Sequence, residues 1–331
     1  MNGFTVERST IASRIGAALA IVALVILISM PWWAGRAEIR TTIELLYFLA
    51  LAQMWNLLAG YGGLVSVGQQ AYVGLGGYAL LVLALQLGVN PFIAIALAGV
   101  MTALCAIPTA ALVFRLQGAY FAIGTWVVAE VYRLLIANST WLGGGSGASL
   151  TAAVKGIAHW YRDSITFWIA VVLGVGSIVF VYVLLRSRFG LALTALRDSE
   201  MASASLGVHT IRVKLGVYIA SACGTGMIGA LIYLTKLRIS PDAAFSVDWT
   251  AFMIFIVIIG GIGTIEGPII GTLLFFLLRE LLSDLGAWYM IILGCLAVLV
   301  MLFARNGLWG IIAQRFDLYL FPVQRRVRFD K

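Results

Sequence analysis

The sequence predicts an all-α integral membrane protein with about ten transmembrane helices and with glycine-interrupted segments in each half. Of its 331 residues, 62% are hydrophobic and only 11% are charged, whereas soluble domains carry roughly 25% charged residues. The apolar residues also fall in runs of about 20, the length that crosses the hydrocarbon core of a bilayer. We therefore expect a single polytopic membrane domain over residues 1–331.

Ten apolar runs are candidate spans. The first follows Arg8 and Arg14 but ends in Pro31-Trp32-Trp33. Tryptophans are typical of a membrane interface, whereas a cleaved signal ends in small residues, so we expect a spanning helix here. The candidate spans are Ile15–Met30, Ile43–Ala59, Leu64–Leu87, Pro91–Phe114, Ala119–Ala137, Ile165–Leu185, Val213–Thr235, Trp249–Ile262, Pro268–Leu282 and Ala287–Ala304.

The basic residues predict the orientation of these spans, because cytoplasmic connections are enriched in Lys and Arg. With a cytoplasmic N-terminus, Arg115, the connection 186–214 and the tail from Arg305 all fall on the cytoplasmic side. Arg36 and Arg40 are the exception, since they fall outside, although Glu38 lies between them. The net charge of +8 lies in these connections rather than on a basic and aromatic surface, so nucleic acid is not an expected partner.

Two stretches, residues 60–77 and 260–271, contain too many glycines for plain helices. Interrupted spans at corresponding positions of two halves indicate a binding site in transporters, and close helix packing is the alternative. The expected helix-break glycines are Gly68, Gly74, Gly260, Gly261, Gly263 and Gly267. The candidate residues of the substrate pathway are Gln69, Gln70, Tyr72, Glu130 and Glu266.

Charges inside apolar spans are costly and therefore informative. Glu130 and Arg133 lie three residues apart on one helix face, so we expect them to pair, with a pathway role for Glu130 as the alternative. Glu266 precedes Gly267-Pro268, where we expect the chain to break and the next helix to begin. A carboxylate is favoured at a helix N-terminus, so Glu266 is expected to line the inner mouth or to bond backbone amides.

The connection 186–214 is the longest polar segment predicted on the cytoplasmic side. Residues Leu191–Leu206 are compatible with a helix, and Gly207 is a suitable stop. Such a helix suits docking of a soluble partner; a solvated connector is the alternative. The sequence from Arg197 to Val208 resembles the coupling loop of permease subunits in bacterial ABC importers for branched-chain amino acids.

The general signature of that loop is Glu-Ala-Ala, three residues, then Gly. The aligned residues are Met201-Ala202-Ser203 and Gly207, so the spacing is kept, but the acidic residue is absent and Glu200 stands one position earlier. The resemblance implies that this segment couples the chain to an ATPase. The residues that it assigns to coupling are Arg197, Asp198, Glu200 and Gly207.

Further matches to this family follow in order over roughly residues 44 to 312: Gly63–Tyr78, Arg115–Ala122 with Glu130, Gly143–Gly147, Gly260–Gly271 and Gly307–Gly310. The resemblance implies a pore in a bacterial cytoplasmic (inner) membrane, and the count of spans places both termini on the cytoplasmic side. The resemblance implies as partners a homologous second permease subunit, two cytoplasmic ATP-binding subunits and an extracytoplasmic solute-binding protein. Membrane lipid is the partner expected from the composition.

The sequence contains no Gly-x4-Gly-Lys-Ser/Thr phosphate-binding loop. We therefore expect ATP to be bound and hydrolysed by the partner subunits, and this chain not to be an enzyme. His159 and His209 lie far apart, and Cys105, Cys223 and Cys295 form no pairing motif. No cofactor, metal or disulfide is expected.

The leading hypothesis is a permease subunit of an ATP-driven importer that moves branched-chain or related amino acids by alternating access. Within the same family, urea, amides or small aromatic or organic acids are alternative substrates. A secondary transporter is the alternative of another class, with Glu130 or Glu266 as its acidic coupling site. The coupling-type connection 186–214 favours the importer.

Overall fold

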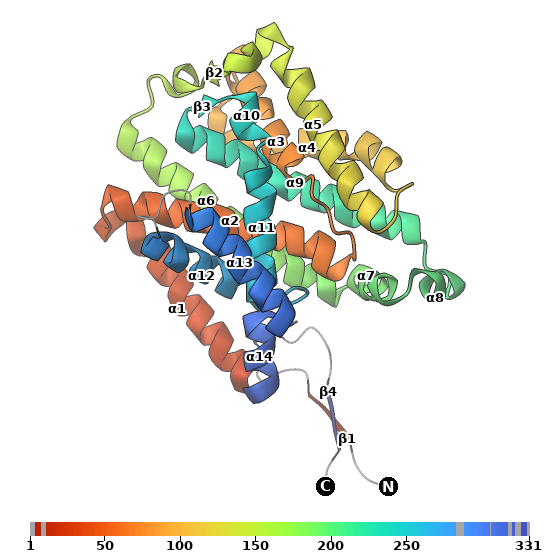
Figure 1. The fold of residues 1–331 in the computed structure, drawn as a ribbon. Coiled ribbons are helices and arrows are strands. Elements are labelled where there is room, and N and C mark those ends of the chain that lie inside the picture. The colour runs from red at the N-terminus through yellow and green to blue at the C-terminus, as the bar shows by residue number, and fades with distance from the viewer. Residues whose placement is uncertain are drawn as a thin grey trace.

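The structure is a computed structural model that describes residues 4–7, 11–282, 288–304, 306–316, 320–321 and 326–329. These residues fold almost entirely into helices (Figure 1). The α-helices are α1 (Ile11–Trp33), α2 (Arg36–Asn56), α3 (Gln70–Leu81), α4 (Pro91–Val113), α5 (Ala119–Ala137), α6 (His159–Arg186), α7 (Arg188–Asp198), α8 (Glu200–Ser205), α9 (Thr210–Lys236), α10 (Pro241–Ala244), α11 (Val247–Gly260), α12 (Glu266–Leu282), α13 (Trp288–Phe303) and α14 (Gly307–Phe316).

Shorter elements complete the described chain. Two π-helical segments, Leu57–Tyr61 and Val82–Gln86, continue α2 and α3. Three 3-10 turns, Thr140–Leu142, Gly144–Ser146 and Thr151–Val154, lie between α5 and α6. Four short strands form two antiparallel pairs, in which β1 (Phe4–Glu7) pairs with β4 (Arg326–Phe329) and β2 (Ala148–Ser149) pairs with β3 (Arg238–Ile239).

The predicted fold class is confirmed. Within the described residues, 8 helical stretches are long and apolar enough to cross a membrane. Gln70–Gln86 and α12 are shorter and correspond to the remaining two predicted spans. The last predicted span, Ala287–Ala304, corresponds to α13, although Ala287 itself lies outside the described residues. Arg8, Arg305 and Arg325 of the predicted basic clusters also lie outside them.

The third span begins later than predicted. Helix α3 starts at Gln70, because the chain from Gly62 to Gln69 is not helical. Gly63 has a positive φ of 67°, a backbone conformation that glycine adopts without steric cost. The π-helical end of α2 therefore stops here, and the predicted helix loses its first turns.

The predicted helix from Leu191 to Leu206 is instead two helices, α7 and α8. Ser199 separates them with an extended backbone, and its hydroxyl accepts from the Ala202 N–H at 3.2 Å. Serine is a favoured N-cap residue, so α8 begins directly after Ser199. Gly207 follows α8 with a φ of +84°, as expected for a helix stop.

The core of the bundle forms around α2 and α9. Helix α9 packs against α3 and α4, and α2 packs against α6, α9 and α11. Large side chains such as Trp55, Tyr72 and Tyr233 are almost fully buried there. Helix α1 lies at the periphery and exposes apolar side chains such as Leu19 and Val22, as a lipid-facing helix does.

The bundle has two ends, which we name by their contents. The loop end holds β2, β3, α10 and the 3-10 turns, and the break end holds α7, α8 and two non-helical stretches, Gly62–Gln69 and Gly261–Ile265. The β2–β3 pair and the α7–α8 segment lie on opposite sides of the molecule (Figure 1). The first and last described strands, β1 and β4, lie side by side as an antiparallel pair (Figure 1).

Candidate functional site

The first break, Gly62–Gln69, packs against neighbouring helices along part of its length, while Gly63 and Val65 are exposed. The indole N–H of Trp55 on α2 donates to the carbonyl of Ser66 at 2.8 Å. A Cβ at Gly68 would overlap the backbone carbonyl of Thr125 on α5, so only glycine fits where the break meets that helix. Non-helical backbone is tolerated at membrane depth where protein or a water-filled cavity surrounds it, and α2 and α5 supply that protein here.

The second break, Gly261–Ile265, is held by two amide side chains of α2. Asn56 Nδ2 donates to the Thr264 carbonyl at 2.8 Å, and Asn56 Oδ1 accepts from the Gly263 N–H at 2.8 Å. Gln53 Nε2 donates to the carbonyl of the last break residue, also at 2.8 Å. Helix α2 thus leads into the first break and supplies hydrogen-bond partners to backbone groups of the second.

Gln53 and Asn56 were not among the predicted site residues. Both are fully buried in α2, and they lie three residues apart on one face of that helix. The signal in the sequence was the pair itself, because two amides in an apolar span need hydrogen-bond partners inside the protein. Their partner is the break some 200 residues later in the chain.

Arg197, at the end of α7, connects the polar segment with both breaks. Its Nη1 donates to the carbonyl of Gly60 at 3.1 Å, two residues before the first break. Gly60 and Gly263 approach so closely that a Cβ at Gly60 would lie 2.6 Å from the Gly263 nitrogen. Asp198 Oδ1 accepts from Arg197 Nε and Nη2 at 3.3 Å and 3.2 Å and helps to orient the guanidinium.

Helix α8 presents an apolar surface outside the spanning helices. Met201 of α8 and Leu206, the residue after α8, are 83% and 84% exposed, while Ser203 of α8 is buried. Glu200 pairs with Lys214 of α9 at 2.6 Å and attaches α8 to the bundle. Large apolar side chains that are this exposed outside the spanning helices are candidates for contact with a protein partner.

The predicted pathway residues Gln69, Gln70 and Tyr72 are all buried at the start of α3. Gln69, with an exposed fraction of 0%, donates from Nε2 to the Ser221 hydroxyl at 2.6 Å. Gln70 bonds the Thr250 hydroxyl through its side chain and its backbone N–H. These contacts fix α3 against α9 and α11, and a pathway role for the three residues remains a prediction.

Three of the predicted helix-break glycines lie inside helices, which corrects the prediction. Gly74 lies in α3, where a Cβ would come within 2.6 Å of the Phe245 ring. Gly260 ends α11 and Gly267 lies in the first turn of α12, and Cβ atoms there would overlap backbone carbonyls of the facing segment. These glycines permit close packing, because small residues let helix backbones approach. The non-helical residues are Gly68, Gly261 and Gly263.

Glu130 and Arg133 pair on α5, as the spacing predicts. Arg133 Nε donates to both Glu130 carboxylate oxygens, at 2.9 Å and 3.0 Å. Arg133 Nη1 also bonds Asp242 of α10. This charged cluster lies on a side of α5 that this chain leaves exposed, beside Trp126 and Val131.

Glu266 occupies the first turn of α12 and is 8% exposed. Its Oε1 accepts from the backbone N–H of Phe321 at 3.1 Å. The residue therefore bonds a backbone amide, one of the two predicted possibilities, and the amide comes from the chain after α14. Whether Glu266 also lines the inner mouth remains a prediction.

Taken together, these features define a polytopic membrane transport protein. The chain passes through two partly buried, non-helical breaks, and Arg197 lies beside both. Residues 35–303 match the family described as branched-chain amino acid transport system / permease component. Because this match covers most of the chain, the protein belongs to that family of permease components.

Individual relatives agree with this assignment. The chain is 27% identical over 328 residues to the high-affinity branched-chain amino acid transport system permease protein LivM of Salmonella typhimurium, covering 92% of this chain and 76% of the relative. LivM of Escherichia coli is 28% identical with the same coverage. The ribose import permease protein RbsC of Haemophilus influenzae is 28% identical over 40% of this chain and 44% of its own length. No solved structure matches the chain.

Proposed function

We propose that this chain is the pore-forming subunit of an ATP-driven importer that moves branched-chain or closely related amino acids across a bacterial cytoplasmic membrane. The family and the names of the two LivM relatives support this substrate class. The observation that carries the mechanism is the bond from Arg197 to Gly60, next to Gly263. Through this hydrogen bond, a movement of α7 and α8 would displace the backbone next to both breaks.

The exposed end of the coupling segment is the proposed site for the ATP-binding subunits. Met201 and Leu206 offer two apolar side chains that a hydrophobic groove can bury. With this assignment the break end is cytoplasmic, in agreement with the basic residues 186–214 on it. The loop end then faces outward and receives the solute-binding protein.

The exposed face of α5 is the proposed site for the second permease subunit and for the pathway between the two. Glu130, Arg133 and Asp242 form a charged cluster on this face. Ionisable groups within a span face protein or a water-filled cavity rather than lipid. In this arrangement ATP-driven closure of the partner subunits moves α7 and α8 and switches the side on which the pathway opens.

Reconstitution tests the function. Proteoliposomes that hold this chain, its second permease and its ATP-binding subunits, with the solute-binding protein outside, are expected to accumulate leucine only when ATP is present inside. Ionophores that dissipate proton and sodium gradients should leave uptake unchanged. Uptake that follows an ion gradient without ATP would establish a secondary transporter instead. Preference for urea or an amide over leucine would keep the importer and change the substrate.

Docking at α8 has its own test. Met201→Asp with Leu206→Asp should abolish copurification of the ATP-binding subunits, because two charges would enter an apolar interface. The matched control is Trp141→Asp with Ala152→Asp, which places the same charges on exposed positions at the loop end. Copurification that survives the α8 substitutions would remove α8 as the docking site.

A further inference from the structure

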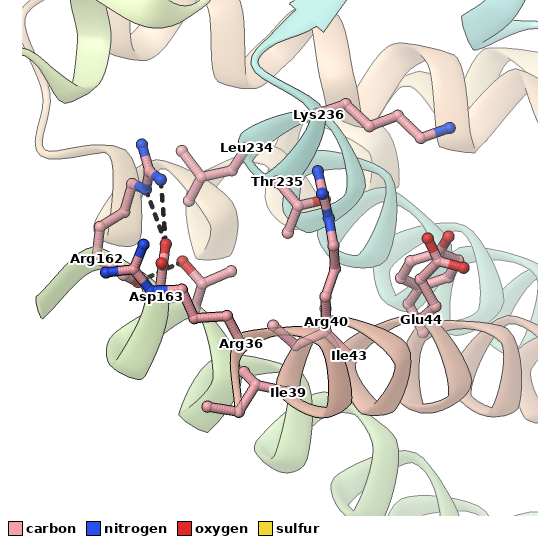
Figure 2. Close-up of a pocket in the computed structure, with 12 residues that line it drawn as sticks. Arg36, Ile39, Arg40, Ile43, Glu44, Arg162, Asp163, Leu234, Thr235 and Lys236 are labelled. Atoms are coloured by element: carbon pink, nitrogen blue, oxygen red, sulfur yellow. Dashed lines mark hydrogen bonds and ion pairs between the residues drawn. The ribbon is translucent and has the colours of Figure 1, made fainter. Parts of the chain in front are cut away.

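A charged pocket lies at the loop end, on the opposite side of the bundle from α7 and α8. Its volume is about 290 Å³, and it opens between the start of α2, the start of α6 and the end of α9. Figure 2 shows Arg40 extending from α2 toward Thr235 of α9, while Arg36 lies near Arg162 and Asp163 of α6. The lining residues are Arg36, Ile39, Arg40, Ile43, Glu44, Tyr47, Arg162, Asp163, Thr166, Leu234, Thr235 and Lys236.

The pocket carries an excess of positive charge. Each of its two carboxylates already has a cation: Asp163 pairs with Arg162 at 3.1 Å, and Glu44 pairs with Arg279 of α12 at 2.9 Å. Arg36 and Arg40 form no ion pair with any described residue. Two guanidinium groups thus line one pocket without an ion-pair partner among the described residues.

Aromatic residues place the pocket at the depth of lipid headgroups. Trp33 ends α1 three residues before Arg36, and Trp32 packs edge-on against Trp168 of α6 with ring centroids 5.8 Å apart. Trp160, near the start of α6, is exposed. Tryptophans concentrate at the boundary between hydrocarbon and water, so the pocket lies at this boundary.

The walls of the pocket combine two chemistries. The charged groups stand beside the apolar side chains of Ile39, Ile43 and Leu234. A phospholipid has the same combination, with a phosphate next to a glycerol unit and the first methylenes of its acyl chains. Ile43 and Leu234 are 7% and 2% exposed, so the apolar contact that the pocket offers a ligand comes from Ile39, which is partly exposed.

We propose that this pocket binds the headgroup of an anionic phospholipid, with the phosphate held by Arg36 and Arg40. The planar guanidinium matches two phosphate oxygens at once. The partly exposed side chain of Ile39 contacts the glycerol and the upper acyl chain. A bound phosphate also accounts for the exception in the charge distribution, since Arg36 and Arg40 are basic residues on the predicted outer side.

Native mass spectrometry of the purified full chain, titrated with phosphatidylglycerol and phosphatidylcholine, tests this proposal. Arg36→Gln with Arg40→Gln is expected to weaken phosphatidylglycerol binding about 30-fold, given the usual contribution of each cation near a charged membrane surface. Arg36→Lys with Arg40→Lys keeps both charges and should retain most of the binding. The matched control, Lys155→Gln with Arg238→Gln, removes two exposed cations of the same end outside the pocket.

Several results would overturn the proposal. One is equal retention of phosphatidylglycerol by the pocket variant and the control variant. Another is displacement of the lipid by glycerol 3-phosphate at equal concentration, which would assign the pocket to a free phosphate compound. A third is unchanged lipid binding together with lost affinity for the solute-binding protein, which would assign the pocket to an acidic protein surface.

Discussion

The side chain of Arg197 joins a segment outside the spans to backbone inside them. Replacing it with Gln removes the bond to the Gly60 carbonyl and the pairing with Asp198. We expect substrate-stimulated ATP hydrolysis by the assembled transporter to fall about tenfold, the size of a typical coupling between two sites. The ATP-binding subunits should remain bound, because Met201 and Leu206 are unchanged.

Arg188 provides the control for Arg197. It begins the same helix and is exposed, so Arg188→Gln removes an equal charge without touching either break. Normal stimulation in the Arg197→Gln transporter would show that the coupling takes another route. Loss of the ATP-binding subunits in that variant would show that Arg197 acts in docking rather than in coupling.

The side chain of Asn56 pairs two backbone groups of the second break. Asn56→Leu leaves the Thr264 carbonyl and the Gly263 N–H without their partner. Each buried group left unpaired costs about 1–3 kcal/mol, so the melting temperature of the detergent-purified chain should fall clearly. Asn138→Leu, at the exposed end of α5, should have little effect. If the Asn56→Leu chain melted at the same temperature as the unmodified chain, water would have to replace the Asn56 amide as the hydrogen-bond partner of the break.

At the scale of elements, glycines inside α3 set its distance from the neighbouring helices. Gly74→Ala would bring a methyl group against the ring of Phe245, and we expect it to lower the melting temperature. Phe245→Leu in the same chain should recover part of the loss by removing the obstacle. Gly294→Ala in α13 has open space around it and is expected to be neutral or stabilising.

This experiment separates the two roles that the glycine-rich stretch 60–77 can have. A lower melting temperature that Phe245→Leu corrects supports close packing of α3. A Gly74→Ala chain with unchanged melting temperature and assembly but lost transport would instead place Gly74 on the substrate pathway.

At the scale of the whole molecule, the orientation of the chain in the membrane can be tested by labelling its two ends. With Cys105, Cys223 and Cys295 first replaced by Ala, Ser146→Cys at the loop end and Ser205→Cys at the break end place single thiols on exposed positions. A membrane-impermeant maleimide added to intact cells should label Ser146→Cys, and Ser205→Cys only after permeabilisation. The reverse pattern would invert the proposed orientation and with it the docking sites.

The sequence determined the class of protein and the approximate positions of the ten apolar spans. Both follow from local properties, since the length of an apolar run and its composition decide by themselves whether a segment partitions into lipid. The pairing of Glu130 with Arg133 was also predictable, because helix geometry fixes which neighbours meet. The end of a helix at Gly207 and the presence of a break in each glycine-rich stretch were predictable for the same reason, because both depend on local sequence.

The tertiary structure alone decided which of these local features meet. Gln53 and Asn56 bond a break some 200 residues away, and Arg197 reaches Gly60 across 137 residues. Gly74 lies inside a helix and Gly68 in a break, although both belong to the same glycine-rich stretch of the sequence. The pocket around Arg36 and Arg40 draws its walls from three helices. Such contacts depend on how whole helix surfaces fit together, and no periodicity along the chain encodes that fit.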